Sequence, residues 1–130
     1  MLRILLSILA GVFAGGIAVA ILEVWLMDLL FDMPDSMIPD DPESVAAHIE
    51  IIPTGAKWLV VLAQGVGAFV ATWVAARVSQ DNRKAAMTAG IIICVFTVMN
   101  LFMIPHPAWM SVAMPLVAIL GLVFGLRNTA

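Results

Sequence analysis

Four long apolar stretches, joined by polar connections, make up most of this chain. They cover residues 4–30, 58–78, 85–104 and 109–126. A helix needs about 20 mainly apolar residues to cross the roughly 30 Å of hydrocarbon in a bilayer, and each stretch is about this long. The pattern therefore predicts an all-α fold, an integral membrane four-helix bundle in a single transmembrane domain over residues 1–130.

The longest connection, residues 31–57, contains a helix start signal. Asp41 is a suitable N-cap, Pro42 suits the first helical position, and Glu43 favours the first turn. Pro53 and Gly55 then interrupt the pattern before the second apolar stretch begins. We expect a short extramembrane helix over about residues 42–51, lying on the membrane surface.

The composition agrees with a chain that lies almost wholly in the membrane. Hydrophobic residues make up 63% of it and charged residues 12%, whereas soluble domains average about 45–50% and about 25%. The segment from Ala18 to Ala20 imitates a signal-peptide cleavage site, but the apolar run continues to Leu30, which is too long for a signal peptide. We therefore expect the first stretch to remain as a spanning helix.

The charged residues are distributed unevenly along the chain. Five of the six basic residues lie near the termini or around the connection between the second and third stretches: Arg3, Arg77, Arg83, Lys84 and Arg127. The positive-inside rule then predicts that both termini are cytoplasmic and that residues 31–57 face outward. Seven of the nine acidic residues lie at or in this outer loop, which is either solvated, a cation-collecting vestibule or a docking surface for a basic partner. The net charge of −3 argues against nucleic acid as a partner.

Small residues recur at four-residue spacing in three of the stretches. Such ridges allow helix backbones to approach closely in lipid, where apolar burial drives little association. The candidate helix-packing residues are Gly11 and Gly15, Gly67 and Ala71, and Gly121 and Gly125. These ridges predict either tight packing within the bundle or self-association of the protein.

Polar residues inside the apolar stretches form the candidate site, because polar groups in a membrane are costly and usually face the protein interior. Glu23, Gln64 and Asn100 fall at a similar depth if each residue adds about 1.5 Å of helix. Thr97 lies one turn before Asn100. We expect these four side chains to form an intramembrane polar cluster. The helical period predicts that Glu23 shares a face with Gly16, Val19 and Ala20.

An outer rim of Asp28, His106 and Trp109 is expected beside this cluster. His106 lies between Pro105 and Pro107, which together favour a rigid turn. Trp109 has the character of an interfacial anchor. His106 is then a solvated turn residue, a hydrogen-bond partner of Glu23 or of the acidic loop, or a ligand or proton relay.

Three segments carry a resemblance to a known family. The first-span glutamate, the segment from Gly67 to Arg77 (GAFVATWVAAR) and the segment from Asn100 to Trp109 (NLFMIPHPAW) resemble an uncharacterised family of small bacterial four-helix inner-membrane proteins. This resemblance implies a multi-pass protein of the bacterial inner (plasma) membrane. It implies no activity.

The segment from Ala20 to Val24 (AILEV) is also similar to the region around the first-span glutamate of the small multidrug resistance exporters. Those proteins are four-span dimers in which this glutamate exchanges protons for cationic drugs, so the resemblance implies a coupling role for Glu23. Two features differ here, since Glu23 lies toward the outer end of its span and the first outer loop is far longer.

Catalytic signatures are absent from the sequence, which has no nucleophile with a nearby base, no metal-ligand set and no cofactor fingerprint. We therefore expect no catalytic residues, no metal, no cofactor and no enzymatic activity. The leading interpretation is a non-catalytic protein of the lipid bilayer, either a self-associating homo-oligomer or an accessory or scaffold subunit of a larger membrane complex. The alternative is a proton- or cation-coupled small-molecule transporter that uses Glu23.

Overall fold

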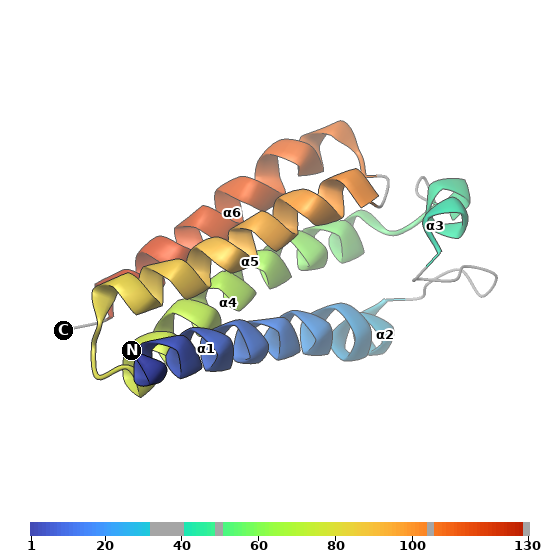
Figure 1. The fold of residues 1–130 in the computed structure, drawn as a ribbon. Helices are drawn as coiled ribbons and strands as arrows, with labels where there is room; N and C mark the ends of the chain where they lie inside the picture. The colour runs from blue at the N-terminus through green and yellow to red at the C-terminus, as the bar shows by residue number, and fades with distance from the viewer. Residues whose placement is uncertain (32–40, 49–50, 104–105, 129–130) are drawn as a thin grey trace.

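The computed structural model describes residues 1–31, 41–48, 51–103 and 106–128, and these residues are mostly helical (Figure 1). Three segments, α1, η1 and α2, follow one another without a break from Leu2 to Leu30, and the other helices are separated by turns or loops. The elements are α1 (Leu2–Ala20), η1 (Ile21–Leu26), α2 (Met27–Leu30), α3 (Pro42–His48), α4 (Thr54–Val78), α5 (Arg83–Met103) and α6 (Ala108–Arg127).

Four of these helical units are long and apolar enough to cross a membrane: Leu2–Leu30, α4, α5 and α6. The described residues contain no strand. The predicted fold class, an all-α four-helix membrane bundle, is confirmed. The chain is accordingly a multi-pass membrane protein, and its helices match the four predicted stretches to within a few residues.

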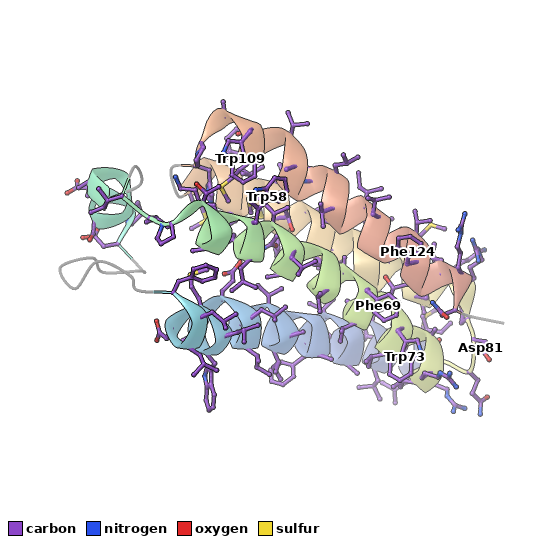
Figure 2. The ribbon with its side chains drawn as sticks, turned by 180° about the vertical axis from the view of Figure 1, so that it is seen from behind. Trp58, Phe69, Trp73, Asp81, Trp109 and Phe124 are labelled. Atoms are coloured by element: carbon purple, nitrogen blue, oxygen red, sulfur yellow. The ribbon has the colours of Figure 1, made fainter. Side chains whose placement is uncertain are left out.

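Helix α4 is the centre of the bundle. It packs against α1, α5 and α6, and α5 also contacts α1 and α6. Twelve of the 25 residues of α4 are buried, against three of the 19 in α1. Figure 2, seen from the side opposite α5, shows α4 lying between α1 and α6. Helices α1 and α6 therefore find most of their packing partners on α4, whereas α5 packs on α1, α4 and α6.

Helix α1 meets α4 through its glycines. A Cβ atom added to Gly15 would lie 2.6 Å from the carbonyl oxygen of Gly67 and 2.9 Å from the Cβ atom of Ala71. A Cβ atom on Gly11 would collide with the carbonyl oxygen of Ala71 and lie 2.9 Å from the Cβ atom of Ala75. These contacts leave no room for a larger residue, so the small-residue ridges of the two helices pack on each other.

The glycines of α6 contact the opposite flank of α4 in the same way. A Cβ atom on Gly121 would collide with the carbonyl oxygen of Gly65, and one on Gly125 would lie 2.7 Å from the Cβ atom of Thr72. Both predicted glycine ridges are therefore engaged inside the bundle.

The two ends of the bundle differ. Both termini and the turn between α4 and α5 lie at one end, where the Arg3 Nε donates to the carbonyl oxygen of Val78 at 3.1 Å (Figure 1). In that turn Asn82 caps α5, because its Oδ1 accepts from the Ala85 N–H at 3.1 Å. Helix α3 lies at the other end.

Helix α3 begins as the sequence predicts. The Asp41 Oδ1 accepts a hydrogen bond from the Glu43 N–H at 3.1 Å, which satisfies one of the unpaired donors of the first turn. The described part of the helix reaches His48, and Ile51, the predicted last residue, lies in a turn. Residues 49–50 lie outside the described part of the chain.

Adjacent glycines in α1 provide a direct test of the contact with α4. Gly15→Ala should reduce the free energy of unfolding by about 1–3 kcal/mol, because the new methyl group forces the backbones of α1 and α4 apart. Gly16 is the control, because nothing lies within 4 Å of the position that its Cβ atom would take. Gly16→Ala should leave stability unchanged or raise it slightly.

The measurement is thermal or denaturant unfolding of the two variants in the same detergent. An equal loss of stability in both would show that α1 does not pack on α4 through Gly15.

Candidate functional site

A chain of side-chain hydrogen bonds crosses the interior of the bundle. The Gln64 Nε2 of α4 donates to the Glu23 Oε1 of η1 at 2.8 Å, and the Thr97 Oγ1 of α5 donates to the Gln64 Oε1 at 2.7 Å. Gln64 and Thr97 are buried, and Glu23 is half-buried. One amide therefore connects three helices through polar contacts inside the apolar region.

The far end of this chain reaches a backbone carbonyl. The Thr97 Oγ1 also lies 3.0 Å from the carbonyl oxygen of Ile93, one turn earlier in α5. A hydroxyl has one proton, so Thr97 donates either to Gln64 or to Ile93 at a given moment. Among the described residues no buried side-chain nitrogen or oxygen lacks a hydrogen-bond partner.

The chain can run in either direction, because an amide can be turned end for end. With an ionised carboxylate, Gln64 donates to Glu23 and accepts from Thr97. With a protonated Glu23, the carboxyl donates to the Gln64 oxygen, the amide donates to Thr97, and Thr97 donates to Ile93. The same three side chains therefore satisfy Glu23 whether it is charged or neutral.

Glu23 lies within a π-helical segment, η1, which the sequence pattern did not predict. Such segments have i→i+5 hydrogen bonds and hence a wider turn than the α-helix, and they occur frequently at functional sites. The wider turn of η1 changes which residues share a face with Glu23. It is the local backbone feature that distinguishes this position from the rest of the first span.

The predicted face of Glu23 is wrong in two of its three residues. Gly16 and Ala20 are exposed, and only Val19 lies toward α4, beside Gly67. The residues directed at α4 instead recur every fourth position: Gly11, Gly15, Val19, Glu23 and Met27. Four residues exceed the 3.6 of an α-helical turn, so this spacing drifts around a regular helix, and the wider π-helical turn takes up the drift.

Asn100 does not take part in the hydrogen-bond chain. It is half-buried, and its side chain makes no hydrogen bond within the part of the protein that the structure describes. The oxygen of Gln64 already accepts from Thr97, which lies three residues earlier and therefore points in a different direction around α5. Of the four predicted cluster residues, the structure brings together Glu23, Gln64 and Thr97.

The residues of the predicted outer rim lie on different elements. Asp28 is exposed in α2, and His106 is half-buried just before α6. Trp109 lies against Trp58 of α4, with ring centroids 4.7 Å apart and planes tilted by 36° (Figure 2). Both tryptophans fit an interfacial belt, but sequence spacing alone gave no sign of their contact. Pro105 of the expected turn lies outside the described residues.

The remaining candidate chemistry is sparse. Within the described ranges, no three side chains of His, Cys, Asp or Glu lie close enough to hold a metal ion. Cys94 is a free, half-buried thiol. Comparisons with protein-family models, with curated proteins and with solved structures found no match for this chain. The hydrogen-bond chain and the surfaces of the bundle are therefore the features that bear on function.

Removal of the Thr97 hydroxyl tests the energetic importance of the hydrogen-bond chain. Thr97→Val should reduce the free energy of unfolding by about 1–3 kcal/mol, because the buried Gln64 oxygen loses its donor. Thr97→Ser should restore most of this stability. The matched control is Thr72→Val, since Thr72 is equally buried but donates only to the Ala68 carbonyl of its own helix, at 2.8 Å.

Unfolding of the three variants in one detergent, followed by tryptophan fluorescence, gives the comparison. If Thr97→Val and Thr72→Val lose the same amount of stability, the hydrogen-bond chain makes no specific contribution to the free energy of unfolding.

Proposed function

We propose that this protein is a non-catalytic structural component of a membrane assembly, either as a self-associating bundle or as an accessory subunit. The observation that supports the proposal is the hydrogen-bond chain from Glu23 through Gln64 to Thr97, in which each of the three side chains has a partner. Its polar groups are occupied in joining the helices, which is a common use of polar side chains between helices in lipid.

The packing of the small residues limits which surfaces can contact a second copy or another protein. Gly11, Gly15, Gly121 and Gly125 are all in contact with α4 of the same chain. They are therefore not available to bring a second copy into close backbone contact. An assembly in which this protein takes part has to use the outward faces of its helices.

Transport coupled to Glu23 is the second candidate, favoured by the surroundings of this residue. Glu23 is half-buried, and it lies in a π-helical segment, a feature that occurs frequently at functional sites. The reversible direction of the hydrogen-bond chain would allow this carboxyl to bind and release a proton without leaving a polar group unsatisfied. Proton coupling at such a site would be lost in Glu23→Gln.

We further infer a place in the bacterial inner membrane with both termini on the cytoplasmic side. The bacterial origin is supported only by the family resemblance of the sequence. The orientation is supported by Arg3, Arg77, Arg83, Lys84 and Arg127, which lie at the same end of the bundle as the termini. Basic residues of multi-pass proteins are retained on the cytoplasmic side.

Cysteine labelling of intact cells tests the orientation. In a Cys94→Ala background, a membrane-impermeant thiol reagent should modify Glu43→Cys in α3 and should not modify Asn82→Cys in the turn between α4 and α5. Permeabilised cells, in which both positions should react, are the control. The reverse pattern in intact cells would contradict the proposed orientation.

Native mass spectrometry together with Glu23 variants tests the function. We expect the protein released from membranes in mild detergent to carry additional copies or a second protein. Glu23→Gln should preserve that assembly, because its amide oxygen still accepts from Gln64. Glu23→Ala should reduce the free energy of unfolding by about 1–3 kcal/mol, because Gln64 loses its acceptor.

Proton flux in vesicles containing the purified protein separates the two candidates. A structural component should give no flux above that of protein-free vesicles under an imposed membrane potential. Flux that is present with the native chain and absent with Glu23→Gln, together with a purely monomeric mass, would replace the structural proposal with the transport one.

A further inference from the structure

The end of the bundle that carries the termini is strongly basic. Five exposed residues lie there, and each of the four spanning units contributes at least one: Arg3, Arg77, Arg83, Lys84 and Arg127. No ion pair joins any of them to a carboxylate in the described part of the chain, although Asp81 lies at the same end. Their positive charge is therefore not neutralised by described acidic residues.

Two of these five side chains are positioned by aromatic rings. The Arg77 Cζ lies 5.2 Å from the ring centroid of Trp73, and the Arg127 Cζ lies 5.9 Å from that of Phe124. Such contacts hold a guanidinium over the ring face and restrict its side-chain freedom. The remaining N–H groups of each guanidinium stay free for another acceptor.

These two arginines belong to neighbouring helices that run in the same direction. Helices α4 and α6 are in close contact near this end, where a Cβ atom on Gly125 would lie 3.2 Å from the carbonyl oxygen of Phe69. Figure 2 shows Phe69, Trp73 and Phe124 on the same side of the bundle, toward this end. Trp73 and Phe124 are exposed, with 39% and 51% of their surface accessible.

A surface with these properties matches the two parts of a phospholipid. Arginine binds phosphate oxygens in pairs through its planar fork of donors. The exposed aromatic surface continues from the arginines toward the middle of the helices, at the depth that acyl chains occupy. Basic sites between spanning helices are a recognised mode of binding anionic headgroups.

We propose that the α4–α6 surface at the basic end binds an anionic phospholipid, with Arg77 and Arg127 holding its phosphate and with Phe69, Trp73 and Phe124 in contact with its acyl chains. The ligand is defined by its negative headgroup and its attached hydrocarbon. This site is separate from the Glu23 hydrogen-bond chain, which lies toward the opposite end of α4.

Native mass spectrometry with defined lipids tests the proposal. The purified protein in detergent should retain phosphatidylglycerol in preference to phosphatidylcholine of the same acyl chains. Arg77→Gln combined with Arg127→Gln should lower the affinity for phosphatidylglycerol by at least about tenfold, because both guanidinium groups lose their paired, charge-assisted hydrogen bonds to the phosphate.

The matched control is Arg83→Gln combined with Lys84→Gln. It removes the same charge from the same end of the bundle, where neither side chain lies over a described aromatic ring. This control should retain phosphatidylglycerol nearly as well as the native chain. An equal loss of phosphatidylglycerol binding in both double variants would overturn the site, because the general positive charge of that end would then explain the binding.

Two further measurements test the aromatic ring and the hydrocarbon part of the ligand separately. Trp73→Leu leaves every charge in place and should still weaken phosphatidylglycerol binding. It tests the site without the arginine variants, whose loss of binding could also come from a folding defect. Unchanged binding would contradict the role of the ring. Soluble glycerol phosphate should not compete for the site. Competition at concentrations similar to those of the lipid would identify a free phosphate site and overturn the lipid assignment.

Discussion

Direct contact between helix backbones on both flanks of α4 is the constraint on which the rest of the structure depends. In a bilayer the hydrocarbon solvates apolar side chains as well as a neighbouring helix does, so helices are held by close packing and by polar contacts. Gly15 meets the carbonyl oxygen of Gly67 on one flank, and Gly121 meets that of Gly65 on the other. Because both contacts use α4, the positions of α1 and α6 are set by one helix.

The hydrogen-bond chain depends on that packing. Gln64 reaches Glu23 and Thr97 because α4 lies against both η1 and α5. A single long side chain can then satisfy groups on two other helices, and the buried polar atoms of the described residues have partners. The closeness imposed by glycine contacts elsewhere on α4 is what makes a bridge through one amide possible.

The two ends of the bundle have different chemistry. One end holds the tilted ring pair of Trp58 and Trp109, which suits the interface between headgroups and acyl chains. The other holds five basic side chains, two of them over aromatic rings, which suits anionic headgroups. Since each spanning unit contributes to the basic end, this asymmetry belongs to the bundle as a whole and gives it a defined direction across the membrane.

Much of this architecture follows from the sequence, because length and hydropathy alone determine which segments can cross a bilayer. They predicted the four spanning helices, and the start of α3 followed from its capping residues Asp41 and Pro42. The four-residue spacing of small residues likewise identified the glycines that now lie between helices. Depth along each helix predicted that Glu23, Gln64 and Asn100 lie at one level, with Thr97 one turn from Asn100, since the rise per residue is nearly constant. The structure joins Glu23, Gln64 and Thr97 by hydrogen bonds.

Direction around each helix was decided only by the tertiary structure. The π-helical turn at Ile21–Leu26 moved Gly16 and Ala20 away from the face of Glu23, and the capture of the Gln64 oxygen by Thr97 left Asn100 outside the chain. The pairing of Trp58 with Trp109 likewise required helices distant in sequence to meet. The rotation of each helix about its axis, and the pairing of its side chains, depend on competition between neighbouring helices for the same contacts. A sequence pattern considered one helix at a time carries no information on that competition.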